Sequence, residues 1–259
     1  MKLAWGRAVA LVVAASVMFG AAACARATWK NKVPPPKDVL VSSLSEYNKG
    51  VYALDFTALD GPGRAAVDSL GQRAYVELNS KRPDASYTVE VLLIEPDAYV
   101  KLNMGQLAEQ PSMRQLNGMT WMRLDPSKVK HAKSLGLKAD ETDLLGLKAM
   151  LQSARSVKPD GDRKYTGTLD LAKGGESPLT DEDVVKSLGD KAAGVPFTAA
   201  LDSDGRLRDL VIGVPAAGDK QAHQLKVSVT QYGAAAVPAK PAAKSLVEAP
   251  AKVYETLNG

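Results

Sequence analysis

The chain has 259 residues, a net charge of +4 and one cysteine, Cys24. So small a net charge in a chain of this length lacks the basic signature of a nucleic-acid-binding protein, and no nucleic-acid partner is expected. A single cysteine excludes an intrachain disulfide. The fold must therefore rest on a hydrophobic core, for which a region of about 200 residues is long enough.

Residues 1–23 have the layout of a secretory signal peptide. Lys2 and Arg7 supply a positive start, an apolar run follows, and small residues lead up to Cys24. The apolar run is shorter than the roughly 20 residues that a membrane-spanning helix needs. These features predict export of the chain and removal of its first 23 residues.

Cys24 follows the predicted cleavage site directly, which resembles the lipobox of bacterial lipoproteins, where the cysteine thiol receives a diacylglycerol. Ala21 stands where a leucine is usual, and Ala21 with Ala23 also suits ordinary cleavage with release of the protein. Lipidation is the favoured alternative, because a free exposed thiol is a liability in an oxidising compartment. The predicted location is the outer face of the cytoplasmic membrane, with Cys24 as the membrane anchor.

Residues 24–36 are expected to be a lipidated N-terminus and tether, ending in the stiff spacer Pro34-Pro35-Pro36. A short first helix is expected within residues 37–47. The pattern then changes to the alternation of a half-buried antiparallel sheet. Strands are predicted at residues 51–59, 74–79, 87–94, 98–103 and 121–124. Residues 92–94 are apolar on both faces, which predicts a covering layer on each side.

A helical block is predicted next. Asp125 is a plausible N-cap with Pro126 at the first helical position, for a helix that runs to about Leu135. Thr142 is expected to cap a second helix, in which apolar residues recur at spacings of three and four. Residues 158–161 would end this helix.

Strands are predicted again at residues 165–171, 196–201, 206–214 and 224–232. Thr180 begins a sequence that resembles a capping box, for a short helix to Leu188. Residues 233–259 form an Ala- and Pro-rich C-terminal tail, expected to be loose, although residues 253–257 could dock back. Strands mostly follow strands through short turns, so the predicted class is α+β with an antiparallel sheet, in a domain of residues 37–232.

Five segments of this domain resemble the LppX/LprG family of actinobacterial lipoproteins, which share a fold with the LolA and LolB carriers. The segments are Asp97-Ala98-Tyr99-Val100-Lys101-Leu102, Gly118 to Ser127 with Trp121 opening a strand, Leu144-Leu145 with Ala154-Arg155-Ser156-Val157, Tyr165 to Leu171, and Val195 to Asp202 followed by Gly205-Arg206-Leu207-Arg208. The resemblance implies a strongly curved antiparallel sheet, a half-barrel, with helices on its concave face.

The resemblance also implies an apolar cavity that binds lipid or lipoglycan acyl chains. Leu144, Leu147, Met150 and Leu151 would line it from the helix side, and Val89, Val91 and Leu93 from the sheet. The alternative is that these residues fill a solid core in a non-enzymatic envelope interaction or sensory lipoprotein. Both alternatives remain open on the sequence, and no protein partner is identified by it.

Enzyme motifs are mostly absent from the sequence. Ser127 and Lys130 have the S-x-x-K spacing of penicillin-binding enzymes without the partner motifs. The two histidines, His131 and His223, have no nearby ligand set, and Asp202-x-Asp204-Gly205 is better explained as a hairpin turn than as a calcium loop. No catalytic residue, metal or cofactor is expected.

Overall fold

The structure, a computed structural model, describes residues 33–258 except positions 60, 83–84, 111–117, 131–142, 175–176, 178, 181 and 219. The chain divides into two compact units, Met1–Val33 and Pro34–Gly259. The predicted signal peptide, Cys24 and most of the predicted tether lie outside the described residues. Within the described residues, no helix combines the length and apolar character needed to cross a membrane.

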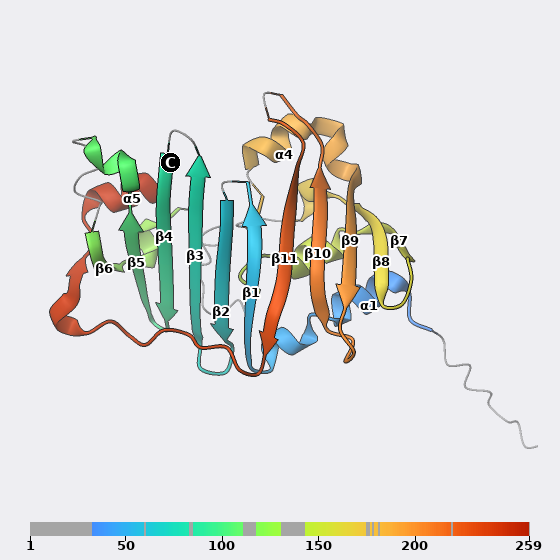
Figure 1. Ribbon diagram of the computed structural model, residues 1–259, viewed down its shortest axis with the longest axis horizontal. Helices are drawn as coiled ribbons and strands as arrows, with labels where there is room; N and C mark the ends of the chain where they lie inside the picture. The colour runs from blue at the N-terminus through green and yellow to red at the C-terminus, as the bar shows by residue number, and fades with distance from the viewer. Residues whose placement is uncertain are drawn as a thin grey trace, which may run out of the picture. The chain divides into compact units, whose positions relative to one another are not determined.

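One curved, open sheet dominates the second unit (Figure 1). Its strand order is β12-β6-β5-β4-β3-β2-β1-β11-β10-β9-β8-β7. The twelve described strands are β1 (Val51–Ala58), β2 (Gly61–Asp68), β3 (Arg73–Arg82), β4 (Ala85–Ile94), β5 (Asp97–Asn103), β6 (Gly118–Leu124), β7 (Arg155–Pro159), β8 (Lys164–Leu169), β9 (Val195–Leu201), β10 (Leu207–Val214), β11 (His223–Tyr232) and β12 (Leu246–Glu248).

The strand order shows two meanders that meet in the middle of the sheet. The first runs from β1 to β6 and the second from β7 to β11, each by antiparallel pairing of successive strands. They join where β1 pairs with β11, with Tyr52 opposite Tyr232. The seam therefore unites strands that are far apart in the sequence.

The described helices are short and lie before β1, in connections between strands, or after β11. None exceeds eight residues, and isolated helices of this length are marginal in water, so packing must hold them. Each α-helix accordingly buries apolar side chains. The helices are α1 (Pro36–Ser42), α3 (Leu147–Gln152), α4 (Glu182–Leu188) and α5 (Ala251–Asn258), with the 3-10 turns η1 (Ser45–Asn48), η2 (Gly105–Glu109), η3 (Pro126–Lys128), η4 (Leu171–Lys173), η5 (Gly189–Gly194) and η6 (Ala243–Ser245).

The α+β class and the curved sheet are as predicted, but the sheet is mixed because β12 pairs with β6 in parallel. Three strands escaped prediction, and one of them, β12, lies in the C-terminal segment that was expected to be loose. The strand β2 begins with Gly61-Pro62-Gly63, which resembles a turn, and β7 ends at Pro159, in the segment expected to terminate a helix. Both lie where strand pairing overrides weak local propensity.

The helix predicted from Asp125 to about Leu135 is wrong in length. Asp125 does cap a helical turn, since its carboxylate accepts a bond from the Ser127 N–H, but η3 ends at Lys128. Val129 is extended and buried. Pro36 also differs from expectation, because it begins α1 instead of extending the spacer, as suits a proline in the first helical turn.

The helix predicted beyond residue 142 begins at Leu147 as α3 and ends at Gln152. The proposed cap, Thr142, lies outside the described residues. The capping role falls to Asp143, whose carboxylate accepts the Leu147 N–H at 2.8 Å and the Lys148 N–H at 2.6 Å. These bonds satisfy backbone donors that a helix start otherwise leaves unpaired.

The prediction of a loose C-terminal tail is wrong for residues 233–250, whereas the expected docking of residues 253–257 is confirmed, since Val253 is buried in the main core. After β11 the chain crosses one face of the sheet, adds β12 beside β6 at its edge, and ends in α5 (Figure 1). Val237 and Leu246 pack on a small cluster of Tyr75, Leu92 and Tyr99, whereas Val253 belongs to the main core. We call residues 233–258 the C-terminal strap, because it contacts both faces of the sheet.

The strap explains the doubly apolar segment in β4. Leu92 lies in the small cluster under the strap, and its neighbours Val91 and Leu93 lie in the main core on the opposite face. Alternation along a strand sends successive side chains to opposite faces. The predicted covering of both faces is therefore confirmed.

Candidate functional site

The residues predicted to line a cavity all belong to the main core or pack against it. Six of them are at most 5 % exposed and one, Val89, is half-buried. The six are Leu144, Leu147, Met150, Leu151, Val91 and Leu93. The structure thus brings the helix-side and sheet-side residues into one apolar cluster.

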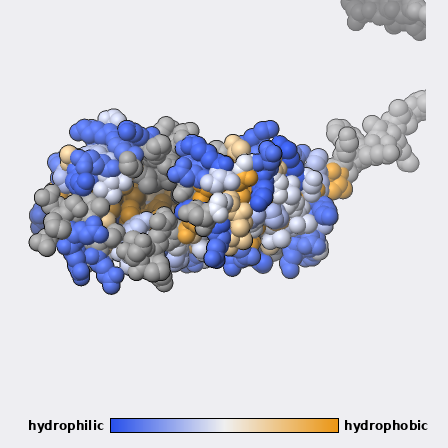
Figure 2. All heavy atoms as spheres, turned by 90° about the horizontal axis from the view of Figure 1, so that it is seen from above, coloured by the Kyte–Doolittle hydropathy of each residue, from blue (hydrophilic) through white to orange (hydrophobic). Residues whose placement is uncertain are grey.

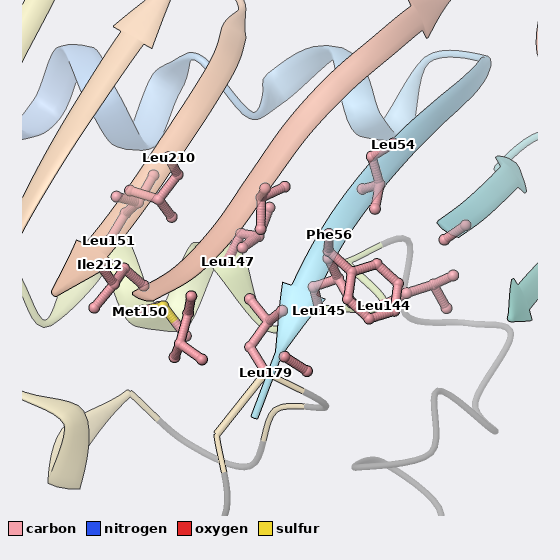
Figure 3. Close-up of a cluster of buried hydrophobic side chains, with 14 of the residues drawn as sticks. Leu54, Phe56, Leu144, Leu145, Leu147, Met150, Leu151, Leu179, Leu210 and Ile212 are labelled. Carbon is pink, nitrogen blue, oxygen red and sulfur yellow. The ribbon is translucent and has the colours of Figure 1, made fainter. Parts of the chain in front are cut away.

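The helix-side residues face different strands from those predicted. Figure 3 shows the labelled side chains of α3 gathered with Leu210 and Ile212 of β10 and with Leu54 and Phe56 of β1. Val89, Val91 and Leu93 lie on β4, which β2 and β3 separate from β1. The wall opposite α3 is therefore built by the seam of the sheet, which the sequence pattern did not predict.

Buried hydrogen bonds fix the chain around α3. The Ser177 hydroxyl donates to the Leu145 carbonyl at 2.5 Å and accepts the Leu179 N–H at 3.1 Å. On the other side of the helix, Arg155 donates to the buried carboxylate of Asp170 at 2.6 Å. Satisfied polar groups of this kind hold a core segment in one position, because leaving them unpaired is costly.

The Phe56 ring packs against β2 at Gly63, a position that has room only for glycine. The ring lies over Gly63, the direct partner of Phe56 in the β1–β2 pair. A side chain at Gly63 would collide with that ring and would approach the Glu77 carbonyl to 2.6 Å. The glycine in this unusual strand therefore serves close packing.

Cover over the apolar face is uneven along the sheet. In the described structure α1 packs mainly on α3 and β7, and α4 mainly on η4 and η5. Four core-facing residues remain only half-buried on β3, on β4 and directly after β1, namely Val76, Leu78, Val89 and Leu59. Figure 2 shows apolar side chains within a hollow at this end of the molecule, between hydrophilic ones.

The open pockets that described residues line include three of a few hundred Å³ each. One of about 620 Å³ lies between η3 and α5, one of about 460 Å³ lies on the polar face of β1–β3 and β11, and one of about 300 Å³ lies beside α1. The first contains Lys128, Lys130 and the ring of Tyr254. The second contains Asp55, and Arg64 paired with Glu77 at 2.6 Å.

A tyrosine cluster at the seam was missed by the sequence analysis. The rings of Tyr47 and Tyr52 stack with centroids 4.3 Å apart, and Tyr232 lies 6.2 Å from Tyr47. Burial raises the pKa of all three hydroxyls, so they stay neutral well above pH 10. The Tyr232 hydroxyl donates to the Leu207 carbonyl at 2.8 Å, and the Arg206 guanidinium lies 4.4 Å from the Tyr232 ring.

The residues considered for enzyme chemistry do not assemble into a site. The Ser127 hydroxyl donates to Asp125 at 2.6 Å, and Lys130 lines the pocket beside α5. His223 contacts the Gln221 carbonyl, and His131 lies outside the described residues. Among the described residues no group of three or more His, Cys, Asp or Glu side chains could hold a metal ion.

The turn predicted at Asp202 joins β9 to β10 as a hairpin. The Asp202 carboxylate accepts the backbone N–H groups of Asp204 and Arg206, both at 2.9 Å. Burial opposes ionisation of Asp202, but these bonds and the Arg206 guanidinium lower its pKa overall. The carboxylate is thus occupied by the turn itself.

No family model and no curated protein matches this chain.

Proposed function

We propose that this protein is a lipoprotein anchored through Cys24 to the outer face of the cytoplasmic membrane, where it binds lipid or glycolipid acyl chains and carries or transfers them. The helices would lie on the concave face of the half-barrel, and the acyl chains would lie between helices and sheet. The observation that carries the proposal is the half-buried apolar surface of Val76, Leu78 and Val89 beside an otherwise buried core.

The physical argument is the removal of apolar surface from water. Each methylene sheltered from water contributes about 0.8 kcal/mol, so one long acyl chain gives several kcal/mol after ordering costs. The half-buried side chains would also lose exposed apolar surface when an acyl chain binds. No covalent chemistry is needed for this role.

A second candidate is a non-enzymatic envelope interaction or sensory lipoprotein with a solid core. The near-complete burial of Leu147, Met150 and Leu151 favours this candidate for the part of the core under α3. The two candidates differ in what they require of β3 and β4. A carrier needs space there for a ligand, and an interaction module needs none.

The first test places a bulky side chain in the proposed cavity. Leu78→Trp and Val89→Trp should each abolish co-purification of lipid, measured by native mass spectrometry with organic extraction. Val211→Trp is the matched control, because Val211 is half-buried but lies on the opposite face of β10, outside the main core. Lipid binding that persists at wild-type level in both cavity variants would contradict the carrier.

Substitutions in α3 separate cavity from core on the helix side. Leu147→Trp or Met150→Trp should reduce lipid binding with the fold intact if acyl chains reach α3. Unfolding, measured by circular dichroism, would instead assign both positions to solid core. This result would confine the proposed cavity to the β3–β4 region.

The anchor is tested separately at Cys24. Cys24→Ala should move the protein from the membrane fraction to the medium, because the thiol is the proposed site of acylation. Continued retention in the membrane fraction would exclude Cys24 as the anchor. Binding of lipid by the released protein would remain a separate measurement.

A further inference from the structure

The pocket between η3 and α5 has a rigid frame that joins distant parts of the chain. The Asp125 N–H donates to the Tyr254 hydroxyl oxygen at 2.9 Å. Asn258 holds the neighbouring residues twice, accepting the Lys130 N–H at 2.7 Å and donating to the Lys128 carbonyl at 3.0 Å. These bonds connect segments about 130 positions apart and define a space of about 620 Å³.

The extended backbone at Val129 directs two lysines to the same side. Val129 has φ −100° and ψ 113° and is 6 % exposed, and its side chain lies in the main core. Alternation in an extended chain points the flanking side chains the opposite way. Lys128 and Lys130 are accordingly exposed and both line the pocket.

The charges of the pocket favour an anion. The Glu255 carboxylate is paired with Lys252 at 2.9 Å, and Asp125 lies 3.6 Å from the Lys128 ammonium. No ion pair within the described part of the chain engages the Lys130 ammonium. Lys128 also lies 5.5 Å from the centroid of the Tyr254 ring, an aromatic wall beside the two cations.

We infer that this pocket binds an anionic group, a phosphate or a carboxylate, and that the group is the head of the amphipathic ligand. Ammonium groups form strong charge-assisted hydrogen bonds with such oxygens. Val129 and Val253, which lie at η3 and α5, belong to the same apolar core as the proposed acyl-chain site. The assignment to a lipid head rests on the proposed function, whereas the anion site itself does not.

The experiment compares two lipids that share their acyl chains, dioleoylphosphatidic acid and dioleoylglycerol, with inorganic phosphate as a third probe. The protein is the whole chain carrying Cys24→Ala, alone and with Lys128→Gln/Lys130→Gln added. Loss of two charge-assisted bonds should weaken binding of the phosphatidic acid by about tenfold or more and leave that of the diacylglycerol unchanged. Raised salt should weaken the binding of the phosphatidic acid and of inorganic phosphate but not that of the diacylglycerol.

Two control variants bracket the result. Lys164→Gln/Lys191→Gln makes the same change of charge at exposed lysines of β8 and η5, and it should leave all three affinities unchanged. Lys128→Arg/Lys130→Arg keeps the charge and should retain binding of the phosphatidic acid. Equal melting temperatures across the set exclude loss of fold as the cause.

The remaining outcomes separate the two proposals. If both lipids bind and Lys128→Gln/Lys130→Gln changes neither affinity, the head-group site is refuted and the carrier stands. If neither lipid binds but phosphate binding is lost in that variant, the carrier fails and the pocket remains a site for a free anion. If no probe binds to the parent protein, both proposals are overturned.

Discussion

The two meanders of the sheet share one alternating pattern but differ in how their apolar face is covered. In β9 and β10 Phe197, Leu210 and Ile212 are at most 2 % exposed, and Leu210 and Ile212 lie close to the side chains of α3 (Figure 3). In the β1–β6 meander Val76, Leu78 and Val89 keep part of their surface exposed. The comparison shows that alternation decides which side chains face the core, whereas the crossover segments decide how completely they are buried.

The opposite faces of the two meanders differ as well. Behind β3–β6 the C-terminal strap covers Tyr75, Leu92 and Tyr99, which form a second small core. Behind β9 and β10 the corresponding positions include exposed Thr198 and Arg208. The first meander therefore has apolar contacts on both faces, and its stability depends on the C-terminal strap.

The largest expected effect on stability comes from truncating one core-facing residue in each meander. Leu210→Ala, in β10 of the second meander, should lower the free energy of unfolding by about 3–5 kcal/mol, because truncating a fully buried leucine leaves a cavity. Val89→Ala should cost only about 1 kcal/mol, since its side chain is half-buried. Chemical denaturation followed by circular dichroism measures both. Equal costs would remove the difference between the meanders.

Two glycines that pack against core phenylalanines give a second comparison between the meanders. Gly63 lies against Phe56 in the first meander, and Gly167 lies against Phe197 in the second. Gly63→Ala should destabilise by about 2–3 kcal/mol, because the added methyl group meets the Phe56 ring and the rigid Glu77 carbonyl. Gly167→Ala should cost less, about 1–2 kcal/mol, because its added methyl group would approach the Arg155 carbonyl oxygen and Phe197 Cε1 to 2.9 Å, a milder clash than at Gly63. The measurement is the midpoint of thermal unfolding. A larger cost at Gly167 would contradict the packing argument.

The strap can be loosened through Asp97, which binds Lys240 at 2.6 Å and Arg123 at 2.8 Å. Hydrogen bonds from Lys240 and then Arg123 lower the pKa of Asp97 from 3.8 to about 2. A depressed carboxylate pKa stabilises the fold above the unfolded value, so this contribution is present above about pH 4 and is lost as the pH falls toward 2. Asp97→Asn should cost about 1 kcal/mol at pH 7.

The control for this prediction is the pH profile itself. Melting temperatures of the parent protein and of Asp97→Asn should differ at pH 7 and converge as the pH approaches 2. A difference that stays constant over this range would mean that the ionised carboxylate does not hold the strap. Lys244→Gln, at an exposed strap lysine away from Asp97, should leave the profile unchanged.

The smallest effects are expected at the seam. Tyr232→Phe should cost about 1 kcal/mol, because it removes the bond to the Leu207 carbonyl. Tyr47→Phe should cost less than Tyr232→Phe, since the buried Tyr47 hydroxyl makes no well-formed hydrogen bond among the described residues and interacts with the nearby Tyr232 hydroxyl. Urea denaturation of the two variants tests the order. A greater loss at Tyr47 would show that its hydroxyl is bonded in solution.

Local pattern was enough to locate most strands. Period-two alternation predicted the strands within residues 51–59, 87–94, 98–103 and 224–232, because one face of each meets a core. It failed at β2 and β7, where glycine and proline are accepted because neighbouring strands supply the hydrogen bonds. It also overextended the helix after Asp125, which ends at Lys128 before the extended and buried Val129.

The sequence by itself determined the α+β class and the apolar residues that share the core, since both follow from side-chain spacing within single strands and helices. Only the tertiary structure decided that β1 lies beside β11, that α3 faces the seam and that the strap adds β12 and α5. Each of these depends on contacts between residues far apart in the chain. Short-range periodicity carries no information about such contacts, because it records which face is buried and not which partner buries it.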